Sequence, residues 1–363
     1  MQLLIMGIAF MKSLGIIFLF IFSLNLKANQ VIHINAEGDF HSNTQKAMIM
    51  ATPGTTLVFP KGKFYLNDEL ILTQSHVTLK GQGMNQTILS FKDQISGAQG
   101  ILATGHAFTI EDIAIEDTSG DGLKVAGADG VVIRRVRVEW TNGPNKNNGS
   151  YGLYPVQSKN VLIEDSLVRG AADAGVYVGQ SKNIIVRRNR AEYNVAGIEI
   201  ENSRFADVYE NVATKNTGGI LVFDLPNLKV KGGRQIRIFN NKIYNNNTKN
   251  FAPKGNIVGI IPAGTGFMVM ANDDIEIFNN EFKKNKSADI AIINYHITEN
   301  EITDPEYDPR PERIHIHNNI FDKRKRRLPN WSKMNTLISI LFNFKTPHIV
   351  YDGIDDGTYG GER

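Results

Sequence analysis

Apolar and polar residues alternate in short stretches along the centre of the chain, and these stretches repeat. Three glycine-led segments, Gly152–Val156, Gly175–Val178 and Gly197–Ile200, are each followed by a polar turn and a second alternating stretch. The second stretch ends eleven residues after each glycine, and the glycines recur after 23 and 22 residues. Alternation with a period of two predicts strands, and a fixed repeat of this length predicts a solenoid of stacked coils.

The second stretch can be followed through eight copies, whose last inward residues are Ile110, Ile133, Ile163, Val186, Val208, Ile238, Ile277 and Ile316. A polar column follows three residues later, at Ser166, Asn189, Asn211, Asn241, Asn280 and Asn319. Asparagine tolerates left-handed turns, and stacked asparagines can hydrogen-bond from coil to coil. Longer steps predict inserted loops at Asn142–Gly149, Asp224–Gly233, Asn246–Gly264 and Glu299–Pro311.

The chain begins with an apolar segment that predicts an export signal. Lys12 supplies a positive charge, Leu14–Leu24 is apolar or small except for one serine, and Leu26–Ala28 resembles a cleavage site. Residues 1–28 are therefore predicted to be a signal peptide, with the mature chain in the periplasm or secreted and without a stable membrane span. A retained membrane anchor is the alternative, although the apolar core is short for a span.

A short helix is predicted at Ser42–Ala51, after the signal segment. Ser42 or Asn43 can cap this helix, and Ala47, Met48 and Ala51 share one of its faces. The open end of a solenoid exposes its core and unpaired strand edges, so a helix in this place can cover them.

The composition of the chain argues against nucleic-acid binding and against any chemistry that needs cysteine. The 40 Lys and Arg residues nearly balance the 37 Asp and Glu residues, so nothing indicates a nucleic-acid-binding face. The basic run Lys323–Arg327 is the exception, and it is typical of a solvated loop. The chain has no cysteine, which excludes disulfides, thiol catalysis and thiolate metal sites.

The columns, the N-terminal helix and the segment Thr56–Tyr65 resemble the right-handed parallel β-helix proteins of the pectate-lyase-like superfamily. More narrowly, five segments resemble an exported bacterial β-helix repeat family of unassigned activity. They are Tyr151–Val156, Asp173–Gln180, Asn194–Ser203, Gly219–Pro226 and Asn250–Gly255. The resemblance implies an all-β fold, a single right-handed parallel β-helix of about ten coils. The coils are expected at residues 57–328, with an N-terminal cap at 29–56 and a C-terminal cap and tail at 329–363.

The superfamily consists mostly of lyases, epimerases and hydrolases of polysaccharides, so the resemblance implies a carbohydrate substrate. Members of the narrower family are often encoded beside a cytochrome-c-like protein, which suggests a partner of that kind. The alginate-epimerase branch carries a catalytic histidine in an Asp-Pro-His-Asp motif, but the nearest match here, Leu153–Val156, has none. No histidine lies between His106 and His296, so a histidine-based epimerase mechanism is not expected in the central coils.

The middle residues of the glycine-led strands should point away from the coil interior, one above another at about 4.8 Å. In chain order they are Lys124, Tyr154, Tyr177, Glu199, Leu221 and Met268. Tyrosine rings can stack on a sugar, and a tyrosine or lysine can move a proton if neighbours lower its pKa. We therefore predict an exposed row whose candidate catalytic residues are Lys124, Tyr154, Tyr177 and Glu199. A solvated sheet face with β-favouring tyrosines is the alternative.

Polar residues beside this row are candidate substrate ligands, namely Gln157, Gln180, Asn202 and Asp224 in one column, with Asp173 and Glu201 nearby. The column can instead be a hydrogen-bond ladder between coils, and Asp173 a turn carboxylate. Glu199 and Glu201 are about 6.6 Å apart along one strand, which suits an inverting hydrolase pair or a calcium site. Glu201 can equally belong to the following turn, and no cofactor other than calcium is indicated.

His315 and His317 lie on one face of a strand, and their two-residue spacing can chelate a metal ion. The sequence shows no third ligand for them, so no metal site is predicted.

Two functional hypotheses follow. The first is an enzyme on uronic-acid polymers, lyase- or epimerase-like rather than a glycoside hydrolase, in which Tyr154 or Tyr177 removes a proton and Lys124 binds the carboxylate. The second is a non-catalytic carbohydrate-binding or assembly protein that partners a periplasmic cytochrome-like protein. The central row and the inserted loops favour the first hypothesis, and the absence of a strong acid–base set favours the second.

Overall fold

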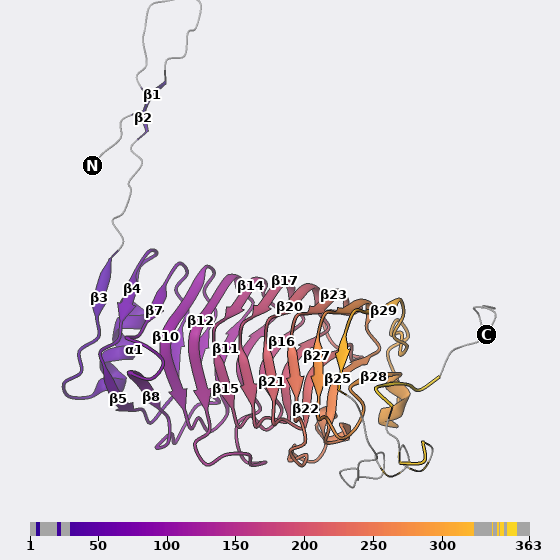
Figure 1. The fold of residues 1–363 in the computed structure, drawn as a ribbon. Coiled ribbons are helices and arrows are strands. Elements are labelled where there is room, and N and C mark those ends of the chain that lie inside the picture. Colours follow the sequence, from indigo (N-terminus) through magenta and orange to yellow (C-terminus); the bar gives the residue numbers. More distant parts are fainter. Residues whose placement is uncertain are drawn as a thin grey trace, which may run out of the picture.

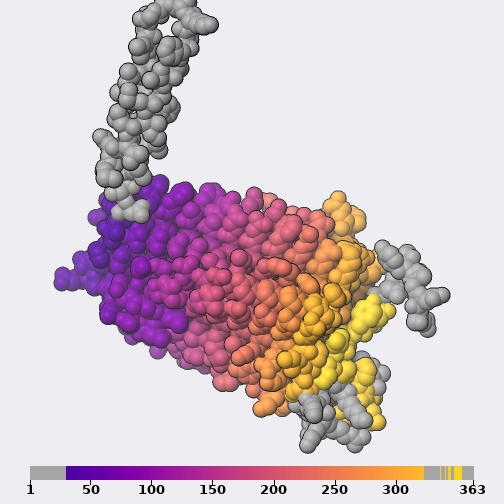
Figure 2. All heavy atoms as spheres, turned by 45° about the horizontal axis from the view of Figure 1, so that its top comes forward, coloured from indigo at the N-terminus to yellow at the C-terminus, as the bar shows by residue number. Residues whose placement is uncertain are grey.

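Parallel strands wind into one elongated solenoid of stacked coils (Figure 1). The computed structural model describes residues 5–7, 20–22, 30–322, 336, 340, 342–344 and 347–353. Successive turns of the chain pair in parallel on three faces, so the predicted all-β, right-handed parallel β-helix is confirmed. Figure 2 shows the same body running continuously from indigo at the N-terminal end to orange and yellow at the C-terminal end.

The first face contains the strands that the sequence marks by its column of inward residues. Its strands are β3 (Val31–His33), β4 (Thr56–Val58), β7 (Thr78–Lys80), β10 (Phe108–Glu116), β12 (Asp129–Glu139), β14 (Lys159–Glu164), β17 (Lys182–Arg187), β20 (Arg204–Tyr209), β23 (Arg234–Phe239), β26 (Asp273–Phe278) and β29 (Ile314–His317). The predicted inward residues are in register along these strands, and all of them are fully buried except Ile316, which is half-buried at the last coil.

The second face consists of shorter strands. They are β5 (Gly62–Tyr65), β8 (Thr87–Ser90), β15 (Leu167–Arg169), β18 (Arg190–Glu192), β21 (Val212–Thr214), β24 (Lys242–Tyr244), β27 (Glu281–Lys283) and β30 (Ile320–Phe321). The long strands β10 and β12 bend through both faces. Residues 109–111 of β10 pair with β7 on the first face, and residues 114–116 pair with β8 on the second.

The third face contains the glycine-led strands and, at its two ends, strands without a glycine. They are β6 (Leu70–Leu72), β9 (Gln99–Ala103), β11 (Asp121–Ala126), β13 (Tyr151–Val156), β16 (Ala174–Gly179), β19 (Ala196–Glu201), β22 (Gly218–Phe223), β25 (Thr265–Met270), β28 (Ile290–Ile293) and β31 (Ile349–Tyr351). They form one ten-stranded parallel sheet, which agrees with the predicted number of coils.

Asparagine side chains join the coils at the turn between the first and second faces, as predicted. Nδ2 of Asn189 donates to Oδ1 of Asn211 at 3.1 Å, and Nδ2 of Asn211 donates to Oδ1 of Asn241 at 3.0 Å. A second ladder, which was not predicted, joins Asn194, Asn216, Asn246 and Asn285 at the next turn. Both ladders are buried, so they satisfy backbone groups that water cannot reach.

The N-terminal helix α1 (Phe40–Met50) is present, but it begins two residues before the predicted start. Asp39 is the N-cap, in place of Ser42 or Asn43, because its carboxylate accepts hydrogen bonds from the amide and the hydroxyl of Ser42. Phe40 and Met48 are buried against the first coils, so the helix covers the end of the core.

Several predicted segments lie largely outside the described residues. Of residues 1–28, only β1 (Ile5–Gly7) and β2 (Phe20–Phe22) are described, and they pair antiparallel. The basic run at 323–327 and most of the predicted C-terminal cap and tail also fall outside. Among the residues that the structure does describe, no helix is long and apolar enough to cross a membrane.

Candidate functional site

The predicted row of side chains is aligned on the outer side of the third face. Tyr177 is in register with Glu199, and the register continues through Leu221 to Met268. Pro155 has no N–H group, and the pairing between β13 and β16 skips both Tyr154 and Pro155.

The prediction that this row is exposed to solvent is wrong for most of its members. Tyr177 is 5% exposed, Glu199 is 1% exposed and Leu221 is fully buried, whereas Lys124 and Tyr154 are half-buried. The inserted loops explain the difference, because they fold over the sheet and form a second apolar cluster on its outer side. That cluster includes Leu221, Phe223, Val258, Ile261, Met268, Met270, Tyr295 and Tyr307. The row therefore runs from an accessible end at Lys124 to a covered end.

Three carboxyl groups gather beneath this cover, those of Asp173, Glu199 and Glu201, and the half-buried carboxyl group of Asp121 adjoins them at the accessible end. The carboxylate of Asp121 accepts the backbone N–H of Tyr151 at 3.1 Å. Oδ2 of Asp173 accepts a hydrogen bond of 3.0 Å from the amide of Asn256, which belongs to one of the covering loops.

The two glutamates occupy alternate positions of β19, and Glu201 lies in that strand rather than in the following turn. Oε1 of Glu201 accepts a hydrogen bond of 2.5 Å from the hydroxyl of Tyr177. Oε2 of Glu199 is buried, and no described residue hydrogen-bonds to it. A buried polar atom without a partner is costly, so its presence calls for an explanation beyond packing.

Three tyrosines pack against one another beside the carboxyl groups. The ring centroids of Tyr151 and Tyr177 are 4.3 Å apart, and the ring of Tyr154 lies 4.6 Å from the first and 5.0 Å from the second. At the accessible end, Nζ of Lys124 lies 4.9 Å from the ring centroid of Tyr154. Aromatic faces next to polar groups are a suitable surface for a sugar ring.

Burial shifts the titration of the carboxyl groups upward. It raises the pKa of Asp121 to about 6 and, with the nearby charge of Glu201, raises the pKa of Asp173 to about 7. Burial also raises the pKa of Glu201 to about 7, although the hydrogen bond from Tyr177 opposes the shift. The pKa of Glu199 is raised well above its ordinary value by burial and by the charges of Asp173 and Glu201.

The tyrosines differ from the expectation that neighbouring groups lower their pKa. Burial and the surrounding carboxylates raise the pKa of Tyr154 to about 12 and raise the pKa of Tyr177 well above its ordinary value. A tyrosine in this environment stays protonated near neutral pH and can donate a proton or a hydrogen bond. The groups that can accept a proton there are the carboxylates.

Two buried glutamates elsewhere in the described coils are arranged differently. Glu116 binds Lys63 and Arg137, and Glu164 binds Arg134, Arg187 and Arg188. These cations lower the pKa of both glutamates despite burial. By contrast, no described residue forms an ion pair with the four clustered carboxyl groups. Ionisable groups with raised pKa values and no counter-ion are typical of functional sites.

The predicted column of substrate ligands beside the row divides into two parts. Asn202 is fully buried, and its amide donates to the carbonyls of Leu225 and Val230, both at 2.9 Å. Asp224 accepts the backbone N–H groups of Gly232 and Gly233. These two side chains hold the inserted loop 224–233 in place.

Gln157 and Gln180 lie at the edge of the third face, where Nε2 of Gln157 donates to Oε1 of Gln180 at 3.4 Å. Gln157 is exposed, so it remains a candidate substrate ligand, although the ladder alternative also describes this contact.

The sequence pattern does not single out Asp121 and Tyr151. Both immediately precede the glycine of a glycine-led strand, and the alternation of apolar residues predicts a strand start at the glycine. Beginning each strand one residue earlier would have included them. Asn256 could not be found in this way, because only the folded loop brings it to Asp173.

A basic groove of about 640 Å³ lies next to the carboxyl cluster, at the turn between the third and first faces, and Gln157 and Gln180 help to line it. Lys159, Lys182 and Arg204 occupy successive coils in register, with the loop residues Lys229 and Lys231 opposite them. Lys231 pairs with Asp304 and Glu306. Among the described residues, none forms an ion pair with Lys159 or Lys182, so their charges are available to a ligand.

Comparisons with known proteins agree with this architecture. A family model described as the right-handed beta helix region matches residues 75–232. The A-module of the mannuronan C-5 epimerase AlgE4 of Azotobacter vinelandii is similar in structure, with a TM-score of 0.58, 18% identity, and coverage of 78% of this chain and 84% of that module. A polygalacturonase from Erwinia carotovora ssp. carotovora has a TM-score of 0.55 and 11% identity, covering 82% of this chain and 95% of the enzyme.

Tailspike protein 2 of bacteriophage CBA120 has a TM-score of 0.56 and 8% identity, covering 92% of this chain and 47% of the tailspike domain. At these identities the likeness shows the fold alone. A search of curated proteins found no relative with significant sequence similarity.

Proposed function

Because the chain folds as a right-handed parallel β-helix, we propose that it is an enzyme that acts on a polysaccharide at the outer side of its third face. The active groups are the clustered carboxyl groups of Asp121, Asp173, Glu199 and Glu201, with the adjacent tyrosines and Lys124. The proposal goes beyond the fold, which is compatible with many activities.

The observation that carries the proposal is the group of buried carboxyls with no cationic partner among the described residues. A scaffold gains no stability by burying acids in this way, since each must stay protonated or be charged at a cost. An enzyme does benefit, because acids with pKa values near 6 to 7 can both give and take a proton at neutral pH.

The proposed reaction is removal of the proton beside the carboxylate of a uronic-acid unit. Asp121 and Tyr154 lie at the accessible end, so Asp121 is positioned to take the C5 proton and Tyr154 to give one. Lys124 then faces the substrate carboxylate, where the charge of the intermediate gathers. The intermediate either expels the oxygen at C4, which leaves a C4–C5 double bond, or takes a proton back at C5 from the opposite side.

The basic groove supports an acidic polymer as the substrate. Lys159 and Lys182 repeat at the coil spacing of about 4.8 Å, which is comparable with one sugar unit of an extended chain. A uronate polymer lying along the coils would meet a cation at each step, and such contacts weaken as salt screens them. Binding should therefore fall with ionic strength.

The test is incubation of the purified chain with polymannuronate, polygalacturonate and neutral polysaccharides, reading both binding and product formation. The Asp173→Asn and Glu201→Gln variants should bind the same polymers and form less product. Product formation that is unchanged in both variants would refute a role for the cluster.

One observation favours a second candidate, a non-catalytic binding or assembly protein. Glu199 and Tyr177 are nearly inaccessible, so a polymer can reach only the Lys124 end of the row in this conformation. Polymer binding without any product would support this candidate. The cytochrome-like partner remains a prediction from the family resemblance, and co-purification from the native cell tests it.

Export completes the proposal, because polysaccharide substrates of this kind lie outside the cytoplasm. Residues 1–28 are proposed to be cleaved, which places the mature chain in the periplasm or outside the cell. N-terminal sequencing of the exported protein should start near Asn29, and recovery with residues 1–28 intact would refute cleavage.

A further inference from the structure

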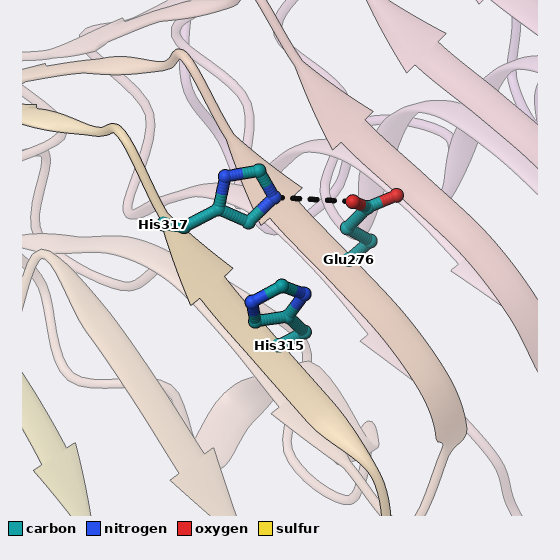
Figure 3. Close-up of side chains that lie close together, drawn as sticks. All are labelled: Glu276, His315 and His317. Atoms are coloured by element: carbon teal, nitrogen blue, oxygen red, sulfur yellow. Dashed lines mark hydrogen bonds and ion pairs between the residues drawn. The ribbon is translucent and has the colours of Figure 1, made fainter.

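A second group of chemically active side chains lies on the first face, near its C-terminal end. Glu276 is on β26, and His315 and His317 are on β29, one coil further along (Figure 3). Glu276 and His315 are register partners in the parallel sheet. The carboxylate is 39 residues before His315 in the sequence, which is why the histidine pair alone suggested no third ligand.

The donor atoms of these three residues converge. One donor atom from each residue lies within 4.8 Å of the other two. Nε2 of His317 is 3.1 Å from Oε1 of Glu276, and the two imidazole ring centroids are 4.4 Å apart. Figure 3 shows both rings on the same side of β29, beside the Glu276 carboxylate. Small side-chain rotations are enough to bring such atoms onto one ion.

The ring of His317 is held in place by a stack of aromatic rings that follows the coils. Phe278 lies 5.1 Å from His317 with an interplanar angle of 1°, and the stack continues through Phe239 to Tyr209. A ligand whose orientation is fixed beforehand loses little conformational entropy when a metal ion binds.

Among the residues that the structure describes, no neighbouring cation competes for the Glu276 carboxylate. Arg237, its register partner in the previous coil, donates two hydrogen bonds to Asp207, at 2.8 and 2.7 Å. Arg313 is paired with Asp273, Asp274 and Glu312. Among the described residues, His317 alone hydrogen-bonds to the Glu276 carboxylate, so the carboxylate can ligate a cation.

We propose that Glu276, His315 and His317 form a binding site for a divalent transition-metal ion, with zinc as the best match. Two imidazoles and one carboxylate are a frequent zinc ligand set, and three protein ligands leave a coordination position for water or a substrate oxygen. His315 is exposed and the other two residues are half-buried, so an ion can enter and the open position faces solvent.

The site lies beside a groove of about 780 Å³ on the first face, which Asp207, Arg237, Asp274 and Glu276 help to line. A hydroxyl or carboxylate group of a ligand in that groove can therefore reach the open position of the metal ion. This inference is independent of the proposed function, because the carboxyl cluster is on the third face and contains none of these residues.

The test is an isothermal calorimetric titration of the untagged, chelator-treated full chain with zinc sulfate. We expect one zinc ion per chain. Because even outer-shell partners of a metal site typically contribute about 10-fold to affinity, His315→Ala, His317→Ala and Glu276→Gln should each weaken binding by at least about 10-fold. The matched control is His33→Ala, which removes an exposed strand histidine on the same face and should leave the affinity unchanged.

Cobalt(II) provides a readout that depends on ligand geometry. Cobalt bound by the wild-type chain should give the visible absorption of a low-coordinate site, and the signal should be lost in His315→Ala but kept in His33→Ala. Circular dichroism confirms that each variant is folded. Zinc affinity that is the same in the wild type and in the His315→Ala/His317→Ala double variant would overturn the proposal, as would the absence of zinc binding by the wild type.

Discussion

The hydroxyl of Tyr177 donates a hydrogen bond of 2.5 Å to Oε1 of Glu201, which lies one coil further along the same covered face. This contact links the tyrosines to the carboxyl cluster. Tyr177→Phe should cost about 1–3 kcal/mol of folding stability, because a buried carboxyl group loses its partner. Since the hydrogen bond lowers the pKa of Glu201, the same change should raise that pKa further.

If the cluster moves protons, Tyr177→Phe should also reduce turnover by about 10²-fold or more, while the fold is kept. Chemical denaturation measures the first effect and product formation the second. Tyr65→Phe is the matched control, since Tyr65 is exposed and distant from the cluster. Equal turnover in the wild type and Tyr177→Phe would contradict a catalytic role for this contact.

The carboxyl cluster should make the protein less stable as pH rises from about 4 to about 7. Burial raises the pKa of Asp173 and Glu201 to about 7, so these groups bind more protons in the folded chain than in the unfolded chain. The contribution of these two groups to folding stability is fully present below their unfolded pKa values of about 4, and it is lost as pH rises to about 7.

The glutamates that form ion pairs have the opposite effect on the pH dependence of folding stability. Arginine and lysine partners lower the pKa of Glu116, Glu164 and Glu192, so their contribution is lost as pH falls below about 4. Thermal unfolding between about pH 4 and pH 8 measures the balance, and Glu201→Gln should reduce the fall in melting temperature above pH 5. A wild-type melting temperature that rises steadily with pH would contradict the raised pKa values.

The coils themselves could be predicted from the sequence because their signal is repetitive. The inward residues from Ile110 to Ile316 and the asparagine column each obey one local rule in every coil, and the parallel pairing places them in register. The start of α1 was less certain, since Asp39, Ser42 and Asn43 are all good capping residues.

The asparagine ladder predicts a large effect for one substitution. In Asn211→Ala, the backbone N–H of Asn189, the carbonyl of Val186 and Oδ1 of Asn241 each lose a buried hydrogen bond. At about 1–3 kcal/mol for a buried group left unpaired, the loss should exceed about 2 kcal/mol in total. Chemical denaturation measures it against Asn147→Ala, which alters an exposed loop and should change stability by less than about 0.5 kcal/mol.

The candidate site was harder to predict, because its surroundings come from distant loops. The alternation of β16 and β19 correctly placed Tyr177 and Glu199 on the outer side of the sheet. It could not reveal that Asn256 and Val258, on an inserted loop, would fold over that side and bury it. The same limit applies to Glu276, which only the stacking of coils brings to His315 and His317.

Lys124 should affect binding of acidic polymers more than neutral ones. Its ammonium group lies at the accessible end of the row, and removing a charged contact worth about 1.5 kcal/mol weakens binding by about 10-fold. Lys124→Ala should therefore weaken the binding of uronate polymers by that amount and leave the binding of neutral polymers unchanged. Uronate binding should fall more in Lys124→Ala than in Tyr177→Phe. Lys242→Ala, an exposed lysine on the second face, is the control. An equal loss for acidic and neutral polymers would argue against a contact with the substrate carboxylate.

The most direct test of the proposed function is proton NMR of uronate polymers incubated with the protein in D₂O. Removal of the C5 proton predicts either solvent deuterium at C5 or the signal of a C4–C5 double bond, and both should decrease in Asp121→Asn and Glu201→Gln. A polymer that binds to the protein but gains neither deuterium nor a double bond would contradict the account, and it would leave the third face as a binding surface only.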